Sequence, residues 1–342
     1  MMKKNIHFLG IDIGGAHTKL IGLDNKKSII FVNQLQFPIW KGTENLNNYF
    51  KKINKNIGNI PCGITMTAEL CDNFKDRLIG VKKIIKCTKK LKLKKYYFCN
   101  QKNKLLINPD LKSIASMNWL ATAEFIKEKV SNCIVVDFGS TSTDLILIKD
   151  KKIINKYYDD FGRLNNSELV YTGLTRTPTS SLTNKVKINN KDFHVMSEFF
   201  SNTADLYRIN KLLSKNMDLY PTCDFRSKSI KNSYKRLARN FGIDFKKKDF
   251  DFIHSLSKKL ISIQLNKIFT EINKFKKINS VRAEFPLIIC GIGKEVMKKY
   301  CKKQKIKVID FKKFLKGNNS KINEASYHAP ATSCALMVSD LN

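Results

Sequence analysis

The chain has 342 residues, enough for two domains of ordinary size, each with its own hydrophobic core. Its formal net charge is +34, but the excess comes from 55 lysines against 8 arginines and is spread over the whole chain. This spread is typical of a compositional bias towards lysine, so we expect no specific nucleic-acid partner and a general attraction for anionic substrates.

The remaining composition excludes several classes of protein. No apolar run reaches the length of a membrane span and the N-terminal residues lack a signal-peptide pattern, so we expect a cytoplasmic protein with no membrane partner. The nine cysteines are scattered singly, and an odd number argues against a full disulfide framework, so we expect reduced thiols. The five histidines are dispersed as well and predict no zinc cluster.

Hydrophobic periodicity predicts a first domain over residues 1–128. Its expected strands are 7–13, 18–23, 28–36, 60–66, 94–99 and 105–107. Its expected helices are 46–57, one that begins after Thr67 as the N-cap, and 113–127.

The second predicted domain covers residues 129–342. It begins with strands between 133 and 156, continues through a polar, threonine-rich segment at 161–200, and is mostly helical over 205–275. A buried strand at 287–290 and a last helix at 329–341 follow. We expect this last helix to pack between the two lobes.

The most informative feature is a turn that the chain contains twice. In both copies a strand ends in an aspartate, and small or hydroxyl-bearing residues lead into a second strand. The first copy contains Asp12, Gly14, Gly15, His17, Thr18 and Lys19. The second contains Asp137, Gly139, Ser140, Thr141, Ser142 and Asp144. The copies align in register, with Asp12 over Asp137 and Lys19 over Asp144.

A turn of this kind directs several backbone N–H groups and hydroxyls to one point, which suits a phosphate. A carboxylate beside it would repel phosphate directly, so Asp12 and Asp137 are predicted to hold a hydrated Mg²⁺ or to position a water or nucleophile. The alternative is a pair of ordinary hairpins. Hairpins need no aspartate at a fixed place, so the repetition favours a clamp for a di- or triphosphate.

Two further patterns extend the candidate site. Gly291 and Gly293 form a glycine turn after the strand at 287–290, a third candidate ligand-facing element with weaker support. Because this chain strongly favours lysine, an arginine suggests a position where the planar guanidinium group, with its several N–H donors, is required. Seven of the eight arginines are candidates: Arg77, Arg163, Arg176, Arg208, Arg236, Arg239 and Arg282.

Seven segments carry a family resemblance: 10–19, 65–81, 115–123, 136–148, 168–178, 203–209 and 236–244. With the two D-x-G turns they resemble the superfamily of acetate and sugar kinases, heat-shock ATPases and actin. Within it they resemble the hydantoinase/oxoprolinase-related proteins linked to tetrahydromethanopterin-dependent C1 transfer. The implied fold is α/β, with two ribonuclease H-like domains flanking a central cleft. His17 stands where many relatives would have Asn, and its charge would depend on pH.

The resemblance implies a transferase of methanofuran biosynthesis. It would couple an aminomethyl-furanylmethyl diphosphate to the phenol oxygen of a tyramine, glutamyl-tyramine or tyrosine acceptor and release diphosphate, with Mg²⁺ as cofactor. The implied partners are these two small molecules, and a homo-oligomer stays open. Two other functions also stay open: an ATP-dependent small-molecule kinase or hydantoinase/oxoprolinase-type hydrolase, and a nucleotide-binding regulator.

Under this interpretation Lys19 neutralises phosphate, and Arg176 grips the diphosphate or a glutamyl carboxylate. Asp144 deprotonates the phenol, binds metal, or forms an ion pair with Lys19. Glu69 and Arg77 are predicted to form a helix-face ion pair, with a place in the wall of the cleft as the alternative. Asn118 and Trp119 are predicted to be packing residues, and Asp205 and Arg208 to form an i, i+3 pair.

Overall fold

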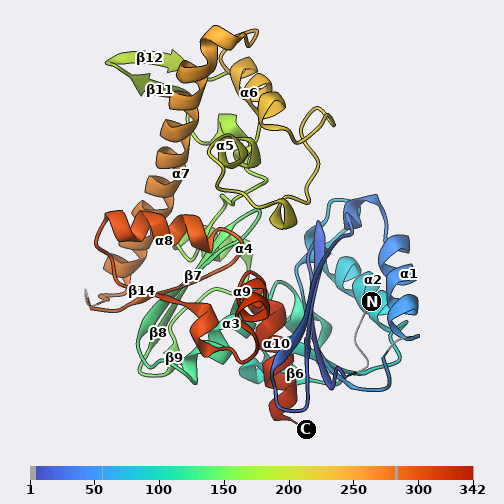
Figure 1. The fold of residues 1–342 in the computed structure, drawn as a ribbon. Helices are drawn as coiled ribbons and strands as arrows, with labels where there is room; N and C mark the ends of the chain where they lie inside the picture. Colours follow the sequence, from blue (N-terminus) through green and yellow to red (C-terminus); the bar gives the residue numbers. More distant parts are fainter. Residues whose placement is uncertain (1–4, 56, 282–283, 342) are drawn as a thin grey trace.

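The computed structural model describes residues 5–55, 57–281 and 284–341 (Figure 1). The first half of the chain forms a six-stranded sheet in the order β3-β2-β1-β4-β5-β6. Its strands are β1 (Phe8–Ile13), β2 (His17–Leu23), β3 (Ile29–Gln36), β4 (Pro61–Met66), β5 (Lys94–Cys99) and β6 (Lys104–Leu106). These strands lie within or close to the ranges that the apolar stretches of the sequence predict.

The second sheet repeats this plan. Its order is β10-β8-β7-β13-β14, with β9 paired to β8. Its strands are β7 (Cys133–Phe138), β8 (Thr143–Lys149), β9 (Lys152–Ile153), β10 (Leu169–Val170), β13 (Leu287–Cys290) and β14 (Val308–Asp310). β1 and β7 each pair antiparallel with the next strand in the chain and parallel with a later one. The predicted α/β fold with two similar domains is confirmed.

The helices are α1 (Glu44–Ile53), α2 (Arg77–Thr88), α3 (Asn118–Lys127), α4 (Asp160–Asn165), α5 (Thr203–Ile209), α6 (Ile230–Arg239), α7 (Phe250–Ile278), α8 (Lys294–Lys303), α9 (Asn319–Ala325) and α10 (Ala329–Asp340). α7 extends from the second sheet to a hairpin of β11 (Lys185–Ile188) and β12 (Lys191–His194), beside α5 and α6 (Figure 1). No helix among the described residues combines the length and apolar character needed to cross a membrane.

Two helix starts differ from the prediction. Thr67 makes no capping hydrogen bond and precedes only the 3-10 turn Ala68–Leu70. α2 begins later, where the Asp76 carboxylate accepts a hydrogen bond of 2.7 Å from the Ile79 N–H group. The expected helix 113–127 is divided because Ser116 has a φ of 56°, so α3 begins only at Asn118.

α10 lies against β1, β4 and α3, between the two sheets (Figure 1). Two glycines permit this contact. A Cβ atom on Gly10 would lie 2.0 Å from the Ala331 carbonyl oxygen, and one on Gly63 would lie 2.5 Å from that of Cys334. The first turn of α10 is therefore held close to the carboxyl end of β1, which ends in the first D-x-G turn.

Candidate functional site

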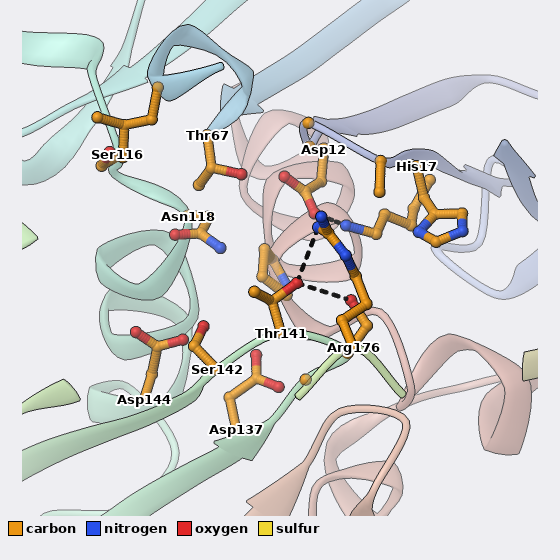
Figure 2. Close-up of a pocket in the computed structure, with 18 of the residues that line it drawn as sticks. Asp12, His17, Thr67, Ser116, Asn118, Asp137, Thr141, Ser142, Asp144 and Arg176 are labelled. Carbon is orange, nitrogen blue, oxygen red and sulfur yellow. Dashed lines mark hydrogen bonds and ion pairs between the residues drawn. The ribbon is translucent and has the colours of Figure 1, made fainter. Parts of the chain in front are cut away.

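Both D-x-G turns open into one cavity of about 550 Å³. Figure 2 shows Asp12 and Thr67 on one side of it and Asp137, Thr141 and Ser142 on the other. The sequence-predicted residues in the wall are Asp12, Gly14, Gly15, His17, Lys19, Asp137, Gly139, Ser140, Thr141, Ser142, Asp144 and Arg176. Folding therefore brings together two turns that are far apart in the sequence.

Strand pairing sets the partner of each aspartate. In the first hairpin Asp12 lies opposite Lys19, and the Lys19 ammonium forms an ion pair of 2.8 Å with the Asp12 carboxylate. In the second, Asp137 lies opposite Asp144, and the Arg163 guanidinium donates to Asp144 at 2.8 Å. The alternative of an ion pair between Lys19 and Asp144 is therefore wrong.

Asp137 has a strongly perturbed carboxyl group. Its residue is 8% exposed, and burial, followed by the charge of Asp144, raises the pKa of Asp137 to about 7. Burial also raises the pKa of Asp144, although Arg163 opposes the shift. Asp12 has one carboxylate oxygen, Oδ1, that is buried without a hydrogen-bond partner. This group of carboxylates therefore favours a bound cation.

The residues of β2 alternate between the cavity and the core. His17 and Lys19 line the cavity, whereas Thr18 is fully buried and does not line it. Burial, with the Lys19 charge as the next cause, lowers the pKa of His17 to about 3. His17 is therefore neutral at physiological pH, and the expectation of a pH-dependent charge is wrong for that range.

Arg176 connects the second turn to the other lobe. It donates a hydrogen bond of 3.1 Å to the Thr141 hydroxyl (Figure 2). Its guanidinium carbon lies 4.6 Å from the ring centroid of Tyr220 and 5.4 Å from that of Trp40. Trp40 belongs to the 3-10 turn Ile39–Lys41 of the first lobe. No local sequence pattern links these two aromatic residues to Arg176.

Gly291 and Gly293 do not line the cavity, although Ile292 between them does. Gly291 has a φ of 81°, and a Cβ atom there would lie 2.3 Å from the Asp137 carboxylate. A Cβ atom on Gly293 would lie 2.2 Å from the ring of Phe138. These glycines let the third turn pack directly on the end of β7.

The interpretation of Glu69 and Arg77 as one helix-face ion pair is wrong. Glu69 is buried and accepts a hydrogen bond of 2.6 Å from the Ser116 hydroxyl, and burial raises its pKa. Arg77 instead lies 3.6 Å from Asp160 in the second lobe. The interpretation of Asn118 as a packing residue is also wrong, because Asn118 lines the cavity.

Several of the candidate arginines are buried, and their guanidinium groups donate hydrogen bonds to carboxylates. Arg208 donates to Asp205 at 2.7 Å, as predicted, and Arg236 donates to the same carboxylate at 2.8 Å. The buried Arg163 donates to Asp144 and lies over the Trp119 ring at 4.2 Å, so Trp119 is a packing residue. Arg282 lies outside the described residues.

The sequence prediction missed the contribution of the segment before and within α10. Tyr327, His328 and Pro330 line the cavity. Other lining residues that were not predicted include Gln34, Trp40, Leu70, Cys71, Asp72, Asp160 and Tyr171. Pro330 in the first turn of a helix predicts where α10 begins, but nothing local connects that start with the D-x-G turns.

The donor set fits one kind of metal ion. Among the described residues no cluster of three or more His, Cys, Asp or Glu side chains could hold a metal. Mg²⁺ needs no such cluster, because it keeps several waters and binds through one or two carboxylates and substrate phosphates. The unpartnered Oδ1 of Asp12 and the carboxyl group of Asp137 would suit it.

The protein has two sheets of similar topology, and in each a D-x-G turn follows the central strand. This architecture defines the α/β class of sugar kinases, heat-shock ATPases and actin. A nucleotide-free acetone carboxylase structure has this fold, with a TM-score of 0.54 at 10% identity over 97% of this chain and 70% of that one. The ethanolamine utilization protein EutJ from Carboxydothermus hydrogenoformans is also similar, with a TM-score of 0.47 at 12% identity over 96% of this chain and 89% of that one.

Sequence comparison identifies the family. The hydantoinase/oxoprolinase family model matches residues 62–320, and the chain belongs to this family. A relative from Methanocaldococcus jannaschii is 34% identical over 86% of this chain and 88% of its own. A second from Methanococcus vannielii is 33% identical over 52% of this chain and 78% of its own. Both are synthases of a furan-2-yl methanamine that carries a phenoxymethyl group with a gamma-L-glutamylaminoethyl chain.

Proposed function

We propose that the protein is a synthase that couples an aminomethyl-furanylmethyl diphosphate to the phenol oxygen of a tyramine-type acceptor, with release of diphosphate, in methanofuran biosynthesis. The observation that carries this proposal is the pair of phosphate-type turns facing one cavity. The two synthase relatives support the same reaction class. A diphosphate clamp serves this chemistry because catalysis must stabilise the charge that grows on the leaving group.

The cationic part of the cavity would bind the diphosphate. The N–H groups of Gly14 and Gly139 close their own turns by bonding to the carbonyls of His17 and Ser142. The N–H groups that follow them, together with the hydroxyls of Ser140 and Thr141, would donate to the diphosphate oxygens. The Arg176 guanidinium already lies at Thr141 and has further N–H groups to offer. Lys19 would supply a second positive charge, although it also neutralises Asp12.

Asp12 and Asp137 would hold Mg²⁺ at the same place. When bound, the ion would neutralise part of the negative charge on the leaving diphosphate. Asp137 would have to release its proton to serve as a ligand, which its pKa of about 7 permits at neutral pH.

The opposite part of the cavity has the character needed for an ammonium group. Asp144 and Asp160 line it together with Asn118, and Asp144 and Asn118 lie away from His17 in Figure 2. A furan substrate with a diphosphate on one side and an aminomethyl group on the other would span the cavity with matching charges at both ends. Leu70 and Tyr171, exposed in the cavity wall, would offer apolar contact to a phenol ring.

The reaction breaks the bond between the furanyl methylene carbon and the diphosphate oxygen and forms a bond from that carbon to the phenol oxygen. The phenol proton has to leave when the ether forms. A base is needed because an unperturbed phenol has a pKa of about 10 and is protonated at neutral pH. Asp144 would accept it, since its Oδ1 is held by Arg163 and its other oxygen remains for the acceptor. Arg163 is fixed in turn by the Trp119 ring, which would keep Asp144 in place.

The test is an incubation of the purified protein with Mg²⁺, the furanylmethyl diphosphate and tyramine, followed by mass spectrometry and a diphosphate assay. We expect the aryl ether and one diphosphate per ether, with no dependence on ATP. The matched control is Asp144→Asn, which should retain diphosphate binding and lose ether formation. Turnover of ATP with another substrate, without ether formation, would refute the proposal.

A further inference from the structure

The first turn of α10 and His328 form a part of the cavity wall that the sequence patterns do not assign. α10 has 12 residues, and its first turn reaches the cavity with Pro330. The N-terminal end of an α-helix carries the positive end of its dipole. Pro330 has no N–H group, so the residue of α10 that lines the cavity donates no backbone hydrogen bond. His328, at the N-cap position, makes no side-chain capping hydrogen bond to the helix.

The side chain of His328 supplies an independent observation. His328 is 4% exposed and lines the cavity, yet its Nδ1 atom has no hydrogen-bond partner. A buried polar atom without a partner costs about 1–3 kcal/mol, so such an atom in a cavity wall points to a ligand. His17, in the wall of the same cavity, also has an unpartnered buried nitrogen, Nε2.

The charges around His328 favour an anion. Burial, with the Lys19 charge as the next cause, lowers the pKa of His328 to about 3, so the ring is neutral. A neutral ring keeps one N–H group, which is available to a ligand in the tautomer that protonates Nδ1. Lys19 lies close enough to act on both histidines electrostatically.

From this arrangement we infer that His328, at the N-terminus of α10, forms a third phosphate-binding element, whose Nδ1–H group donates a hydrogen bond to a phosphate of the leaving diphosphate. The inference rests on the proposed function for the identity of the ligand. It adds a contact from the C-terminal segment to a site built otherwise from the two D-x-G turns. Gly10 and Gly63 make the contact feasible, since they let α10 approach β1 and β4 closely.

The test compares His328→Phe, which keeps the ring volume without a donor, with His328→Asn, whose amide retains a donor near the position of Nδ1. Binding of inorganic pyrophosphate with Mg²⁺ is measured by calorimetry, and KM and kcat are measured for both substrates. The phenylalanine variant should weaken pyrophosphate binding about 10- to 100-fold. The asparagine variant should recover most of it, and the KM of the phenolic acceptor should stay unchanged in both. The control is His194→Phe, on the exposed strand β12.

Several outcomes would overturn the inference. The first is pyrophosphate binding that is equal in the wild type and His328→Phe. The second is the absence of pyrophosphate binding by the wild type. The third is an effect confined to the KM of the acceptor, which would assign His328 to binding of the phenolic substrate. The same data separate the two proposals. His328-dependent pyrophosphate binding without ether formation would refute only the proposed function, and ether formation with unchanged pyrophosphate binding in His328→Phe would refute only the inference.

Discussion

Asp137→Asn should make the protein more stable at neutral and alkaline pH while it abolishes synthesis. The raised pKa of Asp137, about 7 against an ordinary value of 3.8, means that burial next to Asp144 disfavours its charged form. Asparagine has nearly the same shape and never carries that charge. The Asp137 carboxyl group, which is proposed to bind Mg²⁺, would thus lower the stability of the folded protein.

The sign and size follow from proton linkage. Between pH of about 4 and 7 the folded protein holds a proton on Asp137 that the unfolded chain has lost, so the wild-type stability falls as pH rises through this window. Three pKa units correspond to about 4 kcal/mol, which is an upper bound for the stability gained by the variant above pH of about 8. For a chain of this size that is a rise in Tm of roughly 5 °C.

Thermal unfolding of both proteins with a chelator present, from pH 5 to 8.5, measures the effect. The difference in Tm should be small at the acid end and grow with pH, and contributions of other groups cancel in the difference. Asp150→Asn, at an exposed turn after β8, should show no such trend. A variant that is no more stable than the wild type at pH 8, or an offset independent of pH, would refute the reasoning. Adding Mg²⁺ at pH 8 should raise the Tm of the wild type only.

Three further predictions concern the cavity and its supports. Arg176→Lys should weaken pyrophosphate binding about 10-fold in calorimetry, because lysine cannot replace the forked donor between Trp40 and Tyr220; unchanged affinity would contradict this. Asp160→Asn should raise KM for the furan diphosphate about 3-fold in steady-state kinetics, but not for an analogue without the aminomethyl group. Gly10→Ala should cost about 1–3 kcal/mol in denaturant unfolding, and a neutral effect would exclude tight packing of α10 there.

The sequence predicts the fold well because its strongest signals are local. A buried apolar strand followed by Asp, Gly and small or hydroxyl residues predicts a hairpin, and two copies predict two similar sheets. The prediction that Arg208 pairs with Asp205 succeeded for the same reason, since residues three apart on a helix are neighbours. The error at Thr67 has a local cause too: Thr67 and Asp76 both qualify as N-caps, and only the geometry of the 3-10 turn selects Asp76.

Properties that depend on distant contacts could not be read from the sequence. The neutral state of His17 follows from its burial and from Lys19, which no pattern around residue 17 reveals. The partner of Asp144 is Arg163, from a helix 19 residues later in the chain, so an ion pair across the lobes was a reasonable but wrong alternative. Trp40 meets Arg176 only because the two lobes come together, and Tyr220 reaches it from a distant segment of the same lobe.

The pairing within each hairpin explains why two similar turns would perform different tasks. Because Asp12 lies opposite Lys19, the first turn is close to electrically neutral, and its amides and neutral histidine can bind anions. Because Asp137 lies opposite Asp144, the second turn concentrates negative charge, which a metal ion or a proton must offset. A single exchange, lysine for aspartate at one position of the repeat, therefore converts a symmetric phosphate clamp into a site with an anion side and a cation side. A substrate with a diphosphate and an ammonium group requires this asymmetry, whereas a clamp for phosphates alone does not.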